Sequence, residues 1–222
     1  RFGFGDENSD LPSWPRFPPP PTIDKATPAI FGGNTSFRRT WFKGSATFYG
    51  CEFNRVYFSE ALFSEGADFI GTKFNAKAIF KQANFNKGAR FGEWGDTNGL
   101  FVSDADFSDV KFHGDAKFCE NVNGRGPFRG NANFANAQFG RLAEFPGAHF
   151  AKRADFSNAQ FPKKGFPGAD FRSVRFSGDA IFIEARFGAE YHFPDAKFDG
   201  EAIFIDALFP KKKPGFPSPP FV

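Results

Sequence analysis

Phenylalanine recurs along this chain at intervals that alternate between five and six residues. From residue 37 to residue 209 the underlying period is eleven, or 22 if two such units close one turn. The residue two positions before nearly every Phe is small, most often Ala, and the residue between them is usually polar. Because residues two apart in an extended chain point to the same side, we expect Ala and Phe to face inward.

This pattern fits neither an amphipathic helix, which repeats every 3.6 residues, nor a long alternating strand. Short extended segments that turn a corner every five or six residues do fit it. Four such sides close a square coil, and successive coils stack at the inter-strand spacing of ~4.8 Å. The sequence therefore predicts an elongated solenoid whose interior is filled with Phe and Ala.

Three interruptions of the spacing predict enlarged corners. The intervals from Phe91 to Phe101 and from Phe118 to Phe128 each become one step with five extra residues. In the third interruption, "PKKGFPGAD", Phe166 leaves the core, so that 30 inward Phe remain in about 7.5 coils.

Counting sides places the first two insertions on the same corner of consecutive coils and the third on the adjacent corner. We therefore expect Trp94 to lie beside residues 121–125 of the next coil. Two interpretations stay open for this cluster. Corners tolerate insertions because they lie at the surface, and loops gathered at one place can also bind a partner, in which case Trp94 and Phe166 would contact it.

The units "GADFI", "QANFN", "DADFS", "NANFA" and "RADFS" carry a resemblance. They resemble pentapeptide-repeat proteins, and the resemblance extends over roughly residues 35–209. It implies an all-β fold, a right-handed quadrilateral β-helix of about 7–8 coils, with Phe at the central inward position. The alternating spacing is similar to a looser subgroup of that family.

Both ends of the chain are rich in proline and are predicted to be extended arms, at residues 1–34 and 210–222. Proline lacks the backbone N–H that a full ladder of hydrogen bonds needs. One interpretation is that these arms block the open edges of the solenoid. The other takes Trp14 and Phe17 of the first arm as aromatic anchors that contact a partner protein.

Two stretches near the C-terminus, "SGDAIFIEARF" and "DGEAIFIDALF", begin 22 residues apart and should lie on adjacent coils. Their aliphatic residues flank inward Phe residues and should therefore face solvent. These residues are Ile181, Ile183, Ile203 and Ile205, with Leu208 just around the corner. Such an apolar patch predicts a contact with another protein. Coverage of the patch by the C-terminal arm is the alternative.

No catalytic chemistry is evident in the sequence. The three histidines have no Cys, His or carboxylate at a metal-ligand spacing, and nucleophile and phosphate-loop motifs are absent. The balance of 28 bases against 25 acids argues against a strongly basic nucleic-acid binder. No run of 18 apolar residues occurs that could span a membrane. We predict no enzyme activity, no cofactor, no metal site and no direct binding of nucleic acid.

The sequence favours a non-catalytic scaffold or accessory subunit that binds other proteins in a larger assembly. The alternative is an inhibitor that mimics nucleic acid, a role that some members of the resembled family have. Such mimicry needs acidic outward columns, but one side becomes basic towards the C-terminus. Its outward residues are Glu52, Lys73, Leu100, Pro127, His149, Arg175 and Lys197.

The resemblance also implies a location, because the family is found in the thylakoid lumen. An arm-bearing member would suit a lumenal subunit of a photosynthetic complex, peripheral to the membrane. Another exported compartment would suit it as well, and the cytoplasm is the alternative.

Overall fold

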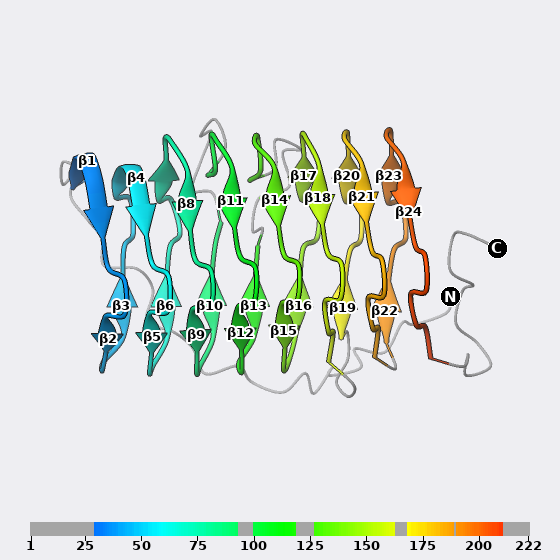
Figure 1. Ribbon diagram of the computed structural model, residues 1–222, viewed down its shortest axis with the longest axis horizontal. Helices are drawn as coiled ribbons and strands as arrows, with labels where there is room; N and C mark the ends of the chain where they lie inside the picture. The colour runs from blue at the N-terminus through cyan, green and yellow to red at the C-terminus, as the bar shows by residue number, and fades with distance from the viewer. Residues whose placement is uncertain (1–28, 93–99, 119–126, 163–167, 189, 211–222) are drawn as a thin grey trace, which may run out of the picture.

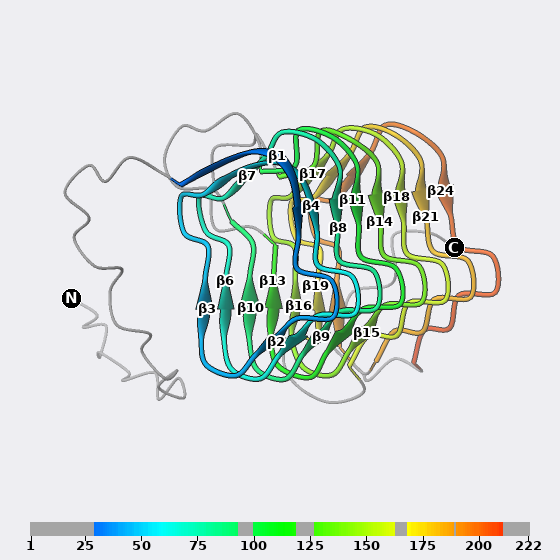
Figure 2. The same ribbon diagram turned by 60° about the vertical axis from the view of Figure 1, so that its left-hand side comes forward.

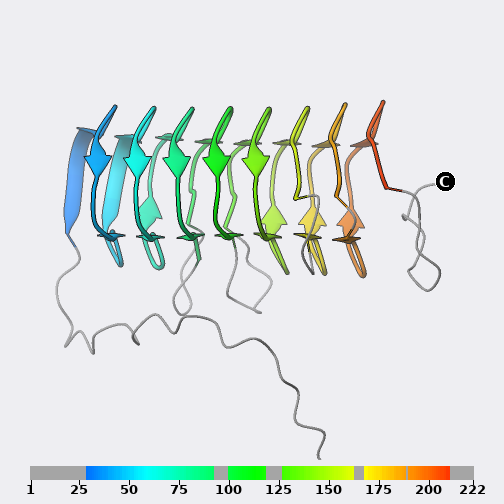
Figure 3. The same cartoon turned by 90° about the horizontal axis from the view of Figure 1, so that it is seen from below.

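The computed structural model describes residues 29–92, 100–118, 127–162, 168–188 and 190–210. Over these ranges the chain is an all-β parallel solenoid of about seven turns (Figure 1). The coils follow one another from the blue to the red end, and the turned view shows their four-sided outline (Figure 2). Seen from below, the strands of successive coils lie in register (Figure 3).

The strands form four columns, which we number as sides 1 to 4 in the order in which each coil visits them. Side 1 contains β1 (Ile30–Ser36), β4 (Glu52–Tyr57), β8 (Ala78–Ile79), β11 (Ala105–Asp106), β14 (Ala132–Asn133), β18 (Ala154–Asp155), β21 (Ala180–Ile181) and β24 (Ala202–Ile203). Side 2 contains β2 (Trp41–Phe42), β5 (Leu62–Phe63), β9 (Asn84–Phe85), β12 (Lys111–Phe112) and β15 (Gln138–Phe139). Single bridges through Gln160, Arg186 and Leu208 continue side 2 to the last coil.

Side 3 contains β3 (Ala46–Thr47), β6 (Ala67–Asp68), β10 (Ala89–Arg90), β13 (Ala116–Lys117), β16 (Ala143–Glu144), β19 (Ala169–Asp170) and β22 (Tyr191–His192). Side 4 contains β7 (Lys73–Phe74), β17 (His149–Phe150), β20 (Arg175–Phe176) and β23 (Lys197–Phe198). Bridges between Phe74, Phe101, Phe128 and Phe150 complete it. The first residues of β4 also belong to side 4, where Phe53 pairs with Phe74.

The predicted 22-residue turn is confirmed by the strand pairing. Ala180 pairs with Ala202, and Lys197 pairs with Arg175. The first strand, β1, begins at Ile30 and pairs with β4, so the solenoid starts within residues 1–34, which were predicted to be an extended arm.

The interior is a stack of phenylalanine rings. All 30 predicted inward Phe residues belong to the core or pack against it, and Phe31 joins them. Rings on the same side of successive coils lie parallel, as Phe63 and Phe85 do with centroids 4.6 Å apart and planes 3° apart. Rings across a coil meet edge to face, as Phe69 and Phe80 do at 5.4 Å and 88°. Both are favourable geometries for aromatic rings.

The alternation of five and six residues arises from two kinds of corner. The steps from side 1 to side 2 and from side 3 to side 4 take five residues unless an insertion intervenes, and many use a residue with positive φ two places after Phe. Gln82 (φ 59°) and Gly71 (φ 67°) are examples. No described residue at the six-residue corners has a positive φ. A left-handed residue tightens the turn and thereby shortens the step by one residue.

The polar residue of the A-(D/N)-F unit stabilises the turn that follows it. The side-chain Oδ1 atoms of Asp106 and Asn133 accept hydrogen bonds from the backbone N–H groups of Ser108 and Ala135, at 3.0 Å each. The same bond recurs at Asp68, Asp155 and Asp170. Asp and Asn favour such turns because their short side chains reach the backbone two residues on.

Two departures from Ala at the inward position have local explanations. Thr72 is buried, and its hydroxyl donates a hydrogen bond to the carbonyl of Phe48 at 2.6 Å. Tyr191 occupies the Ala position in the last coil of side 3, where its ring packs against Phe187 and Phe209 at 5.7 and 5.1 Å. A large side chain fits there because β22 is the last strand of its column.

Candidate interaction surfaces

The isoleucine patch, which we define as Ile181, Ile183, Ile203, Ile205 and Leu208, forms at the C-terminal end of the solenoid. Ile181 of β21 pairs with Ile203 of β24 on side 1. The corner residues Ile183 and Ile205 follow each inward Phe, and the N–H of Glu184 donates to the Ile205 carbonyl at 2.8 Å. Leu208 lies around the corner on side 2. The two stretches therefore stack on adjacent coils, as predicted.

The exposure of the patch increases towards its outer edge. The prediction that all five residues face solvent is wrong for Ile181, which is only 7% exposed because β21 lies between β18 and β24. Ile205 and Leu208, in the last coil, are 60% and 58% exposed. The last coil thus presents large aliphatic side chains to solvent beside a half-buried Ile203.

The other predicted contact residues, Trp14, Phe17, Trp94 and Phe166, lie outside the described residues. The residues that flank the first two insertions are described. Phe91 stacks on Phe118 with centroids 4.9 Å apart before the corner, and Phe101 bridges to Phe128 after it. The two insertions therefore start and end on the same corner of consecutive coils. The contact between Trp94 and residues 121–125 stays a prediction.

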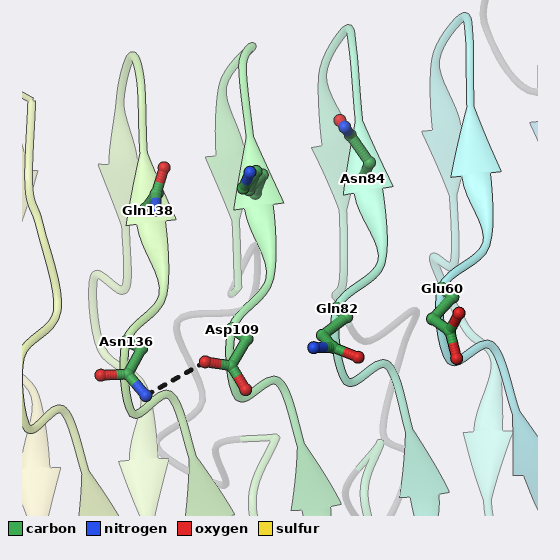
Figure 4. Close-up of a pocket in the computed structure, with 7 residues that line it drawn as sticks. Glu60, Gln82, Asn84, Asp109, Asn136 and Gln138 are labelled. Carbon is green, nitrogen blue, oxygen red and sulfur yellow. Dashed lines mark hydrogen bonds between the residues drawn. The ribbon is translucent and has the colours of Figure 1, made fainter.

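An open groove on side 2 was not anticipated from the sequence. It has a volume of about 470 Å³ and is lined by Glu60, Gln82, Asn84, Asp109, Lys111, Asn136 and Gln138. Figure 4 shows two rows of side chains, one along the corner after side 1 and one along side 2 itself. The Nδ2 of Asn136 donates to Oδ1 of Asp109 at 3.1 Å. The signal that could have revealed it is the recurrence of polar residues with carboxylate or amide side chains at intervals of 22 or 27, as at Glu60, Gln82, Asp109 and Asn136.

Comparison with known families agrees with this architecture. A family model described as "Pentapeptide repeats (9 copies)" matches residues 48–95 and 166–208. The chain is a pentapeptide-repeat protein. Searches of curated proteins and of solved structures found no match to it.

Side 4 of this pentapeptide-repeat protein carries a hydrogen-bonded group of polar side chains. Nε2 of His149 lies 2.9 Å from Oγ of Ser177, and this hydroxyl donates to Oδ2 of Asp199 at 3.2 Å. Burial and the nearby Arg175 lower the pKa of His149. Because Ser177 stands between the imidazole and the carboxylate, Asp199 does not orient the histidine as it would in a hydrolase triad.

Side 3 carries charges that are largely neutralised in pairs. Arg90 contacts Asp68 at 2.6 Å, and Lys117 contacts Glu144 at 3.2 Å. Asp170 is fully buried, and Arg172 binds its carboxylate at 2.6 Å. The hydrogen bond to Asp170 and the negative charge of this carboxylate raise the pKa of Arg172. These pairs leave little net charge along the middle of this side.

Within the described ranges, no helix of the pentapeptide-repeat protein is long and apolar enough to cross a membrane. Over the same ranges, no three His, Cys, Asp or Glu side chains gather as a metal site would require.

Proposed function

We propose that this pentapeptide-repeat protein is a non-catalytic scaffold or accessory subunit that binds another protein through the isoleucine patch. The observation that carries the proposal is the exposure of Ile205 and Leu208 next to Ile203 on adjoining faces of one coil. Soluble proteins seldom leave contiguous aliphatic surface in water, and such surface typically belongs to an interface.

The rest of the solenoid suits a rigid support. Its interior is occupied by stacked rings, and parallel backbone ladders connect each coil to the next. A binding surface on such a support is already ordered before association, which lowers the entropic cost of binding.

The alternative function, inhibition by mimicry of nucleic acid, requires long columns of free carboxylates. On side 3 the acids alternate with bases that bind them, and side 4 has His149, Arg175 and Lys197 in succession. The charge pattern therefore favours the scaffold. The narrower proposal of a photosynthetic complex in the thylakoid lumen rests on the family resemblance alone, and the patch suits a protein partner in any compartment.

Retention of the partner during native purification tests this proposal. Ile205→Asp combined with Leu208→Asp places charges at the exposed edge of the patch, and we expect the co-purifying protein, identified by mass spectrometry, to be lost. These positions are better than Ile181, where an Asp would be buried.

Val102→Asp is the matched control, because Val102 is also an exposed aliphatic residue (37%) but lies outside the patch. It should retain the partner. If the double variant also retains the partner, the patch is not the interface. A lower melting temperature of the isolated double variant would instead indicate that the patch is covered within the chain itself.

A further inference from the structure

The isoleucine patch is bordered by carboxylates on three sides. Asp155 precedes it on side 1, one corner contributes residues 179 and 201, and the opposite corner contributes residues 184 and 206. The four corner carboxylates, which we call the acidic rim, are Asp179, Glu184, Glu201 and Asp206, and all four are exposed.

The acidic rim lacks the ion pairs that neutralise the carboxylates of side 3. Asp155 is bound by Arg153 at 2.7 Å, whereas no side chain in the described ranges forms an ion pair with any member of the rim. Two cations lie next to the rim. Arg186 is beside Leu208 on side 2, and Arg153, which binds Asp155, precedes Asp179 at the same corner. The chain as a whole has a net charge of +3, so this concentration of negative charge is local.

The stacking of the coils brings the rim carboxylates together in pairs. Asp179 and Glu201 are neighbours on adjacent coils, as the 3.2 Å hydrogen bond from the Glu201 N–H to Asp179 Oδ1 shows. Glu184 and Asp206 occupy equivalent left-handed corner positions, with φ of 55° and 54°. Two carboxylates on neighbouring coils repel each other, and a cation placed between them relieves that repulsion.

We propose that the partner of the isoleucine patch presents apolar side chains flanked by lysine or arginine. This inference rests on the proposed function and specifies the chemistry of the partner. The apolar side chains cover Ile203, Ile205 and Leu208, while the basic residues contact the rim at either corner. Complementary charge of this kind fixes orientation and accelerates encounter. The same rim repels anionic lipid headgroups and nucleic-acid phosphates.

One segment of the chain itself has this chemistry. Residues 211–213 are lysines, and Phe216 follows them, shortly after Leu208 in the sequence. The experiment must therefore distinguish two possible occupants of the patch, a partner protein and residues 210–222 of the chain itself.

Fluorescence anisotropy of a short labelled peptide, with leucines flanked by lysines, measures how tightly the full chain binds a sequence of this chemistry. We expect binding that weakens with added salt, because exposed charges are screened. Glu184→Gln combined with Asp206→Asn should weaken binding about fivefold, as expected for two exposed ion pairs. The control variant, Glu65→Gln combined with Asp109→Asn, removes the same two charges far from the patch and should bind normally.

Three outcomes would overturn the inference. A peptide with glutamates in place of the lysines could bind equally well. The protein could bind phosphatidylserine vesicles in the absence of the peptide, and lose that binding in the Ile205→Asp, Leu208→Asp variant. Finally, the peptide could bind only when Lys211, Lys212 and Lys213 are all changed to Ser, which would identify residues 210–222 as the occupant. If the Ile205→Asp, Leu208→Asp variant loses its partner but the rim variant does not, the proposed function stands and this inference fails.

Discussion

At the scale of single residues, the coil is specified by three positions in each repeat unit. Phe fills the interior, Ala two places before it leaves room for the rings, and Asp or Asn between them accepts a hydrogen bond from the following turn. Each choice has a separate physical cause, and all three favour the same backbone. Agreement of this kind between local and global preferences is what lets a repetitive sequence fold to one structure.

A buried ring in the middle of the solenoid should contribute strongly to stability. Phe134 is fully buried and stacks on Phe156 with centroids 4.9 Å apart. We expect Phe134→Ala to lower the free energy of unfolding by about 3–5 kcal/mol through lost burial and a cavity. Denaturant unfolding measures this change. Phe166→Ala, at the predicted corner, should cost less than about 1 kcal/mol, and an equal loss in both variants would contradict the predicted position of Phe166.

The lowered pKa of His149 predicts a pH-dependent stability. Because the folded state disfavours the imidazolium form, the unfolded chain binds more protons near the ordinary histidine pKa of ~6.5. The stability that this histidine contributes is therefore present above ~6.5 and decreases as the pH falls below it. His149→Asn should flatten the dependence of melting temperature on pH in this window. His113→Asn, at an exposed position, should leave it unchanged, and the account fails if both variants behave alike.

At the scale of the structural elements, the corners decide how closely successive coils approach. Gly44 and Gly114 occupy the same position, two residues after Phe, at the corner from side 2 to side 3. A Cβ at Gly114 would lie 2.4 Å from the carbonyl carbon of Lys87, whereas nothing lies within 4 Å of a Cβ at Gly44. Equivalent sequence positions therefore tolerate side chains differently.

This contrast gives a matched pair of substitutions. Gly114→Ala should lower the free energy of unfolding by more than about 1 kcal/mol, because the backbone of the preceding coil must shift. Gly44→Ala should leave it unchanged or raise it by about 0.4–1 kcal/mol, because Ala has fewer conformations in the unfolded chain. Thermal and denaturant unfolding would compare the two variants. Equal destabilisation would show that the close approach at Gly114 does not limit the packing.

The sequence predicted the columns of the solenoid because nearly every inward position carries either Phe or a small residue, most often Ala. The pairing of Ile181 with Ile203 follows directly from that count. The start of β1 at Ile30 was not predicted, since "IFGGNTS" lacks Ala before its first Phe. The side 2 groove and the acidic rim were also missed. The groove combines residues of a corner and a side, and the rim combines residues of two corners, so no single column of the sequence contains either of them.

At the scale of the whole molecule, the solenoid behaves as a one-dimensional stack in which each coil contacts only its neighbours. Stability is therefore distributed along the stack, and a surface change at the last coil should not propagate to the middle. This separation would allow the terminal coils to carry the proposed interface while the ring core maintains the shape. It also means that binding at the isoleucine patch should leave distant coils unaffected.

Hydrogen–deuterium exchange of the native assembly, compared with the isolated chain, tests the docking of a partner on the isoleucine patch most directly. We predict slower exchange on assembly in residues 177–187 and 199–209, which contain the patch and its rim, with no change in residues 105–118 of the middle coils. Unchanged exchange in residues 199–209, or protection confined to other coils, would contradict the account.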